Sequence, residues 1–196
     1  MSLDFDFFSI DPKFSKPKKG RILISEPFLG DQYFKRSVVF LTEHNKDGSV
    51  GFVLNKPVNV EMKEVVKGFP DVESPVSIGG PVGTDSVHYI HTLGEMIPES
   101  VQVYKNIYWG GDFTTIKDLL SSGLISNDKI RFFVGYSGWA PRQLENEISA
   151  NSWVIADMDT NRIMGTRSES IWQETLSKLG SKYKLWTSFP ENPDMN

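Results

Sequence analysis

Short apolar runs dominate the first half of the chain and predict β-strands. Residues 21–24, 37–42 and 50–54 are rich in the β-branched and aromatic side chains that strands favour. The turn sequence Asn45-Lys46-Asp47-Gly48 separates the last two runs, so we expect them to form a hairpin. Because these runs are apolar at nearly every position, the strands are expected to be buried on both faces. Further strands are predicted at residues 76–78, 87–92, 101–108, 129–134 and 153–156.

Helical spacing of apolar residues appears mainly in the second half of the chain. It is clearest at residues 112–122, where Asp112 provides an N-cap and Gly123 follows the last turn. The segment Gly135-Tyr136-Ser137-Gly138-Trp139 follows the predicted strand 129–134. We interpret this segment as a strand-to-helix turn with Trp139 packed in the core. The other predicted helices cover residues 61–67, 141–151 and 168–179.

The order of these elements favours an α/β fold of the mixed α+β type. Hairpins dominate early and single helices lie between strands later, so we expect one domain with a central mixed, largely antiparallel sheet or barrel-like core and flanking helices. Residues 20–180 form this domain, residues 1–19 an N-terminal arm and residues 181–196 a loosely held C-terminal tail. In the arm, the aromatic side chains Phe5, Phe7 and Phe8 are expected to dock on the body.

Composition narrows the function classes. The chain has 196 residues, a net charge of −4 and 39% hydrophobic residues, which is typical of a folded globular protein. The negative charge argues against direct nucleic-acid binding, although Lys13, Lys16, Lys18 and Lys19 form a local basic run. The chain contains no cysteine and no apolar run of membrane-spanning length, and its first residues do not resemble a signal peptide. We therefore expect a cytoplasmic protein without membrane contact.

The segment Gly135–Trp139 is the nearest match to a catalytic motif. It resembles the nucleophile elbow Gly-x-Ser-x-Gly, but Trp139 stands where the elbow needs a small residue. Ser137 is therefore a weak nucleophile candidate, and the segment is interpreted as a core-packed turn or as a ligand-binding turn. The glycines of residues 79–84 lack the ending of a phosphate-binding loop, and they favour close approach of the backbone.

The histidines give no metal site. His88 and His91 are three apart in a predicted strand, so they face opposite sides of the sheet. His44 has only a carboxylate neighbour, Glu43, which is a poor zinc site. No metal and no cofactor is predicted.

Two groups of polar residues are candidates for a ligand site: Asp31, Arg36 and Asn55 at one edge of the sheet, and Glu145 on a helix that faces a cleft. Arg36 and Asn55 lie at the same end of the predicted hairpin, and Glu145 on the helix 141–151 is expected to reach back toward the Gly135–Trp139 turn. The alternative for Asp31, Arg36 and Asn55 is that each satisfies backbone groups in a turn, and the alternative for Glu145 is a solvated helix carboxylate.

A series of motifs runs along the body of the chain: residues 20–27, Asp31, Phe34, residues 36–39, 48–57 and 79–82, 135–139 and 143–148, and Trp153. Taken together and in order, these motifs resemble the YqgE/AlgH family of bacterial proteins. The resemblance implies an α/β fold in a cytosolic protein and implies no known reaction, although the AlgH branch is a proposed transcriptional regulator. In the family the glycine-rich segment usually reads Gly-Tyr-Ala-Gly-Trp, so Ser137 replaces an alanine, and Arg142 stands where a glycine is usual.

The sequence therefore favours a non-enzymatic protein that binds a small ligand or a protein partner, with at most an indirect role in transcription. No catalytic residue is assigned. The alternative is a hydrolase or transferase whose members would be Glu145, Arg36 and His44, with Ser137 as a remote option. Direct DNA binding would rest on the basic arm alone. The candidate ligand-binding residues are Arg36, Asn55, Gly79, Gly80, Gly135, Gly138, Arg142, Gln143 and Glu145.

Overall fold

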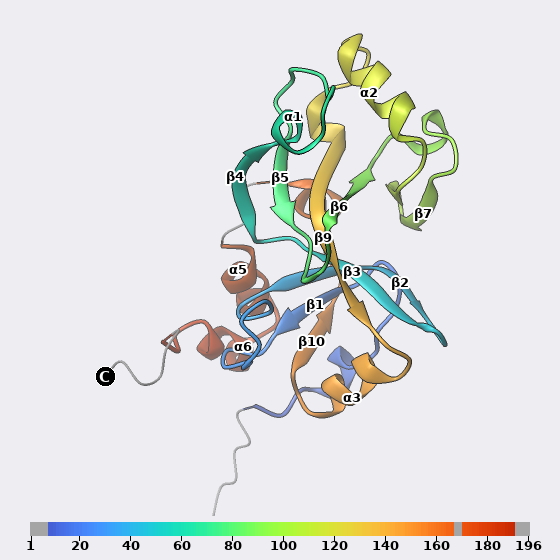
Figure 1. The fold of residues 1–196 in the computed structure, drawn as a ribbon. Helices are drawn as coiled ribbons and strands as arrows, with labels where there is room; N and C mark the ends of the chain where they lie inside the picture. Colours follow the sequence, from blue (N-terminus) through green and yellow to red (C-terminus); the bar gives the residue numbers. More distant parts are fainter. Residues whose placement is uncertain (1–7, 167–169, 191–196) are drawn as a thin grey trace, which may run out of the picture.

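A large twisted sheet organises the molecule (Figure 1). The computed structural model describes residues 8–166 and 170–190. Within these residues ten strands join in one sheet of order β10-β1-β2-β3-β9-β6-β8-β7, and β5 pairs with both β9 and β4. All pairings are antiparallel except that of β5 with β9. The predicted mixed, largely antiparallel sheet is confirmed, and it does not close into a barrel. The strands are β1 (Ile22–Ser25), β2 (Val38–Asn45), β3 (Gly48–Val53), β4 (Pro57–Glu61), β5 (Pro75–Ile78), β6 (Val82–His91), β7 (Val101–Tyr104), β8 (Ile107–Trp109), β9 (Ile130–Trp139) and β10 (Trp153–Ala156).

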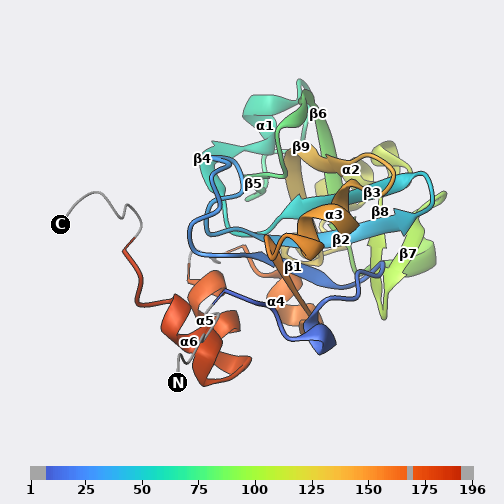
Figure 2. The same ribbon diagram turned by 90° about the horizontal axis from the view of Figure 1, so that it is seen from below.

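The central strands are buried on both faces, as their continuous apolar runs predict. In β1, Ile22 and Ile24 point into one core, and Leu23 between them points into another. Side chains alternate across a strand, so each run fills two cores. Helix α3 packs against the core that contains Leu23, whereas α4, α5 and α6 cover the core that contains Ile22. Figure 2 shows α3 over β2 and β3, with α5 and α6 set to one side.

Six short α-helices surround the sheet in the described part of the chain. Asp112 caps α2 as the sequence predicts, accepting hydrogen bonds from the backbone N–H groups of Thr114 and Thr115. Helix α4, which the sequence did not suggest, begins after its own cap, Asp159. The helices are α1 (Met62–Val65), α2 (Phe113–Ser121), α3 (Gln143–Ser149), α4 (Thr160–Met164), α5 (Ile171–Lys178) and α6 (Ser181–Trp186), and single 3₁₀ turns lie at Pro12–Phe14, Gly94–Met96 and Asn127–Lys129.

Strand β9 corrects the interpretation of the segment Gly135–Trp139. This segment is the second half of one ten-residue strand, and the chain turns only after Trp139. β9 pairs with β5 and β6 along its first part and with β3 at residues 137–139. In Figure 1 it runs from the upper half of the molecule to the lower half. It therefore joins two halves of the sheet, one made of β10, β1, β2 and β3 and the other of β4 to β8. A second correction concerns residues 101–108, which form the hairpin of β7 and β8 rather than one strand.

The expectation of a loosely held tail is wrong for residues 181–190. They contain helix α6, whose side chains Tyr183 and Trp186 are 3% and 0% exposed. In the arm, Phe8 docks as expected and packs its ring against those of Phe28 and Trp186. The predictions for Phe5, for Phe7 and for a helix start at Ser168 concern positions outside the described residues.

Candidate functional site

Three of the predicted site glycines lie where the backbone that follows β5 crosses the backbone of β9. They are Gly79, Gly80 and Gly135. A Cβ atom at Gly80 would lie 2.3 Å from the Tyr136 carbonyl carbon, and one at Gly79 would lie 2.3 Å from the Gly135 carbonyl oxygen. Gly135 itself has a φ of +66°, which other residues rarely adopt. The expected close approach of the backbone is thus present, and β9 fills the space that a ligand would need at these positions.

Gly138 lies differently, because it borders an open cleft. The cleft has a volume of about 360 Å³ and lies between the tip of the β2–β3 hairpin and the end of β9. A Cβ atom at Gly138 would be 3.2 Å from the Tyr136 ring and 3.9 Å from Val82. The absence of a side chain at Gly138 therefore keeps this space free. The cleft is lined by Glu43, Asn45, Asp47, Gly48, Ser49, Val50, Val82, Tyr136, Gly138 and Trp139.

The character of the cleft follows from this lining. Tyr136 contributes an aromatic ring to the lining, and Val50 and Val82 contribute apolar side chains. The rim carries the carboxylates of Glu43 and Asp47, and Glu43 also accepts a hydrogen bond from Asn45 at 2.6 Å. Such a mixture of apolar and polar groups is typical of a small-ligand site.

On the opposite face of the sheet, Glu147 binds two tryptophans. Its Oε2 atom accepts hydrogen bonds from Trp139 Nε1 at 2.9 Å and from Trp153 Nε1 at 2.7 Å. Its Oε1 atom accepts from the side-chain amide of Gln143 at 2.9 Å. The ring of Phe34 stacks on Trp139. The expectation that Glu145 reaches back toward Trp139 is therefore corrected, because Glu147 makes these contacts.

Sequence reasoning missed Glu147, although a signal was present. Glu147 follows Leu144 by three positions and precedes Ile148, and both of these apolar residues are buried. Positions three and four apart share one face of a helix. Glu147 therefore lies on the buried face of α3, where a carboxylate needs donors such as the indole N–H groups.

The remaining predicted residues of α3 lie toward solvent. The Glu145 side chain is 48% exposed, and its Oε1 atom lies 3.9 Å from His44 Nε2. Arg142 is exposed and has a φ of +65°, a backbone conformation that glycine adopts more readily than arginine. Gln143 accepts a hydrogen bond from the Ala140 N–H and so fixes the entry into the helix.

His44 has a second contact that the sequence did not predict. Its Nδ1 atom lies 2.8 Å from Ser49 Oγ on the neighbouring strand. The side chains of Ser49, His44 and Glu145 thus form a row of contacts in the order serine, histidine, carboxylate. Ser49 is only 5% exposed, however, so its hydroxyl group has little access to a substrate.

Ser137 is fully buried and donates its hydroxyl hydrogen to the Gly79 carbonyl oxygen at 2.9 Å. It contacts neither His44 nor Glu145 among the described hydrogen bonds and ion pairs. The hydroxyl group therefore joins β9 to the end of β5, and it lacks the base that a nucleophile needs.

Arg36 and Asn55 are brought together at the far end of the hairpin, as their positions predict. Asn55 Oδ1 accepts a hydrogen bond from the Val38 N–H at 2.8 Å, and Asn55 Nδ2 donates to the Arg36 carbonyl oxygen at 2.7 Å. These contacts hold Arg36 at a φ of +49°. The pair is separated from the cleft by the length of β2 and β3, so the structure divides the predicted residues among several places.

His88 and His91 of β6 lie on opposite faces of the strand, as its period of two predicts, and they contact different neighbours. His88 packs against the rings of Phe52 and Tyr136, and His91 stacks on Tyr108. Burial lowers the pKa of both imidazoles. Within residues 8–166 and 170–190, no group of three or more histidine or carboxylate side chains is placed to hold a metal ion.

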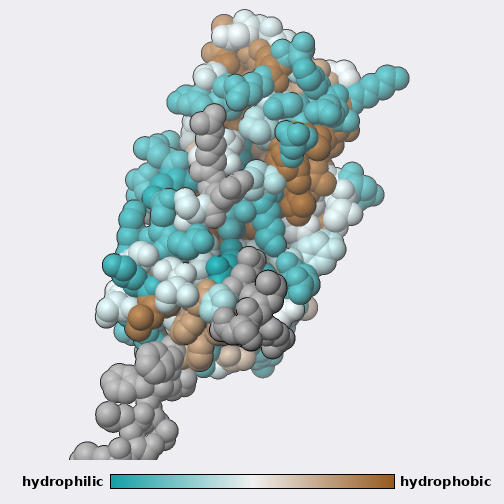
Figure 3. All heavy atoms as spheres, turned by 90° about the vertical axis from the view of Figure 1, so that its left-hand side faces the viewer, coloured by the Kyte–Doolittle hydropathy of each residue, from teal (hydrophilic) through white to brown (hydrophobic). Residues whose placement is uncertain are grey.

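The outer surface combines polar and apolar regions. Figure 3 shows hydrophobic side chains gathered in the upper half of the face on which α1 and β4 lie in Figure 1. The exposed large apolar residues include Val65 of α1 and Ile78 of β5. Among the described residues, no helix is both long and apolar enough to span a bilayer.

Comparison with known proteins gives one consistent family. The model of the AlgH-like family matches residues 22–184. A UPF0301 protein of Bacteroides fragilis is 43% identical and a UPF0301 protein of Bacteroides thetaiotaomicron 40% identical, and both alignments cover 100% of the two chains.

Two solved structures have the same fold. Protein DIP2367 of Corynebacterium diphtheriae aligns with a TM-score of 0.74 and 22% identity over 96% of this chain and 100% of its own. The AlgH protein of Pseudomonas aeruginosa, a UPF0301 protein, aligns with a TM-score of 0.69 and 26% identity over 90% of this chain and 97% of its own.

Proposed function

We propose that this chain, which belongs to the AlgH-like family, is a non-enzymatic binding protein that takes a small ligand or a side chain of a protein partner in the cleft beside Gly138. The observation that carries the proposal is the cleft of about 360 Å³ against Tyr136, Gly138 and Trp139. The most distinctive sequence segment of the chain thus borders its open space. The catalytic set that the sequence allowed does not converge there, since Arg36 and Ser137 lie elsewhere.

Under this proposal, any role in transcription is exerted through a protein partner and not through contact with DNA. Part of the basic charge of the arm is compensated, because Lys13 forms an ion pair with Asp11. The net charge of −4 adds no attraction to a phosphate backbone. The cytoplasm is the compartment that the composition favours.

A thermal-shift screen of the full chain against nucleotides and common metabolites tests the proposal. A ligand that binds only the native state at 100 times its Kd stabilises that state by about 2.7 kcal/mol. Gly138→Val should abolish the shift, because its side chain enters the cleft. Gly30→Val is the matched control, since no atom lies within 4 Å of a Cβ at Gly30. A ligand that stabilises both variants equally binds elsewhere, and a ligand that the protein converts to product makes it an enzyme.

The second candidate function is a hydrolase based on Ser49, and the short contact of Ser49 Oγ with His44 favours it. Labelling with a fluorophosphonate probe separates the two functions. The binding proposal predicts no labelling at pH 7–8, because Ser49 is buried. Labelling that disappears in both Ser49→Ala and His44→Ala would establish the hydrolase instead.

A further inference from the structure

The side chain of Arg36 has an unusual environment for a half-buried cation. Its Nη2 atom donates a hydrogen bond to the Phe189 carbonyl oxygen at 2.5 Å, and its guanidinium carbon lies 5.1 Å from the centre of the Trp172 ring. Its Nε atom is buried and has no acceptor within the described residues. In the same part of the chain, Arg36 belongs to none of the ion pairs.

This environment favours an anion. A guanidinium group carries five N–H donors in a planar fork that matches a carboxylate. Within residues 8–166 and 170–190, a single neutral carbonyl satisfies one of these donors, and the buried Nε–H has no partner. Buried donors without acceptors are rare in native proteins and call for an explanation. A carboxylate at the position of the Phe189 carbonyl would supply both the charge and the second acceptor.

The backbone at Arg36 is held in an uncommon conformation independently of such a ligand. The φ of +49° at Arg36 is an uncommon conformation for a residue with a side chain. The two hydrogen bonds of Asn55 to the Arg36 carbonyl and the Val38 N–H maintain it. Local strain of this kind is characteristic of binding positions.

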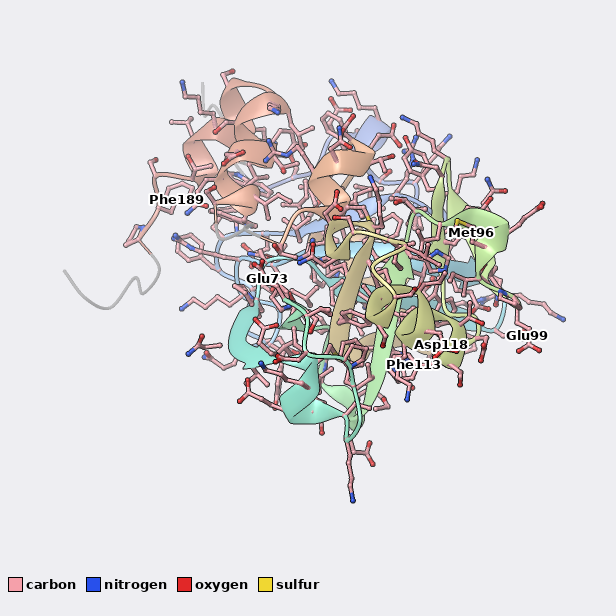
Figure 4. The ribbon with its side chains drawn as sticks, turned by 90° about the horizontal axis from the view of Figure 1, so that it is seen from above. Glu73, Met96, Glu99, Phe113, Asp118 and Phe189 are labelled. Atoms are coloured by element: carbon pink, nitrogen blue, oxygen red, sulfur yellow. The ribbon has the colours of Figure 1, made fainter. Side chains whose placement is uncertain are left out.

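Phe189, whose carbonyl oxygen contacts the Arg36 guanidinium, indicates which second group the ligand carries. The ring of Phe189 lies 5.5 Å from that of Phe28 and 5.9 Å from that of Phe8. Phe189 therefore presents an acceptor oxygen to a cation and an aromatic ring to the rings of Phe8 and Phe28. Figure 4 shows Phe189 beside the C-terminal helices, on the opposite side of the molecule from Phe113 and Met96.

We infer that Arg36, Phe8 and Phe28 form a second binding site, whose ligand is an aromatic carboxylate and whose place is held by Phe189 of the chain itself. The carboxylate binds the guanidinium fork, and the aromatic group replaces the Phe189 ring. The same chemistry is found in a free aromatic acid and in the C-terminal phenylalanine of a peptide. The site lies at the opposite end of the hairpin from the cleft and does not depend on the function proposed for the cleft.

The experiment uses the full chain with Phe189→Ala, which empties the aromatic position. 3-Phenylpropionate is titrated into this variant and into the unchanged protein and followed by NMR. The variant should bind at least about tenfold more tightly, because no ring of the chain then competes for the aromatic position and the ligand displaces only the backbone carbonyl of residue 189. The neutral probe 3-phenylpropionamide should bind about tenfold more weakly than the acid, since it lacks the charge. Equal binding of acid and amide overturns the proposal, as does the absence of binding to Phe189→Ala.

Second substitutions in the Phe189→Ala background test the role of Arg36. Arg36→Gln should remove the preference for the acid, and Arg36→Lys should retain part of it, which keeps the test valid if the glutamine variant does not fold. Arg142→Gln is the matched control, because Arg142 is an exposed arginine that also has positive φ. Retention of the preference in both Arg36 variants contradicts the proposal. N-acetyl-Ala-Phe with a free or an amidated C-terminus then distinguishes a peptide ligand from a free acid.

Discussion

At the scale of single residues, Glu147 and Glu145 have opposite environments on one short helix. Glu147 accepts both indole N–H groups, whereas Glu145 is half-exposed. Trp139 and Trp153 are 4% and 0% exposed, so neither N–H can find water when its acceptor is removed. Two residues of the same type, two positions apart, therefore differ in what they contribute to stability.

We predict that Glu147→Ala lowers the free energy of unfolding by about 3 kcal/mol, since each orphaned buried donor costs about 1–3 kcal/mol. Glu145→Ala should change it by less than about 0.5 kcal/mol. Urea unfolding followed by tryptophan fluorescence measures both. Equal losses in the two variants would show that the carboxylate does not secure the tryptophans.

At the scale of elements, His91 joins the end of β6 to the segments beside it. Its Nε2 atom lies 3.1 Å from the Gly110 carbonyl oxygen after β8, and its Nδ1 atom accepts from the Leu93 N–H at 3.3 Å. One ring nitrogen must donate and the other must accept, which only the neutral ring with hydrogen on Nε2 can do. Burial, opposed by the hydrogen bond to Gly110, lowers the pKa of this imidazole from 6.5.

This geometry gives the sign of a pH dependence. Because the folded imidazole has the lower pKa, the unfolded chain binds more protons once the pH falls below about 6.5, and stability is lost from there toward lower pH. His88, whose pKa burial also lowers, acts in the same direction. We predict that His91→Gln reduces the slope of unfolding free energy against pH between 7 and 5. An NMR titration should place the pKa of His91 below 6.5, and a value above 6.5 would contradict the assignment.

The accuracy of the predicted elements depended on whether their signals are local. The β2–β3 hairpin and α2 carry their own turn and cap residues, and both were predicted. Helix α4 has only five residues, too few for a recognisable period, although its cap Asp159 was visible. In β9, Gly135 and Gly138 signal a turn locally, but pairing with β3, β5 and β6 keeps the segment extended. Such tertiary pairing leaves no signal in a short window of sequence.

The residues of the candidate site were likewise predictable only where their signal is local in the sequence. The proximity of Arg36 and Asn55 was predictable, because the register of a hairpin aligns the two ends of its strands. The contact of Arg36 with Phe189 was not, since 153 residues separate the two in the chain. The cleft beside Gly138 was equally hidden, because β9 must first be placed against the tip of the hairpin.

At the scale of the whole molecule, the two halves of the sheet meet where the loop between β5 and β6 crosses β9. Gly80 lies at this crossing, and its ideal Cβ position is 2.3 Å from both the carbonyl carbon and the carbonyl oxygen of Tyr136. These are backbone atoms of a strand that is paired on both sides, so they cannot move away without disturbing β3 or β6. The crossing therefore requires a residue without a side chain.

Gly80→Ala should accordingly cost more than about 3 kcal/mol, the range of severe overpacking, and lower the yield of folded protein. Gly30→Ala tests the same chemical change in open space and should alter stability by less than about 0.5 kcal/mol. Thermal unfolding and hydrogen exchange of both variants provide the measurement. Exchange should accelerate in β3 and in β6 of Gly80→Ala alike, because both pair with the strand that is displaced. Acceleration in one half only would mean that the halves are stabilised separately and that β9 does not couple them.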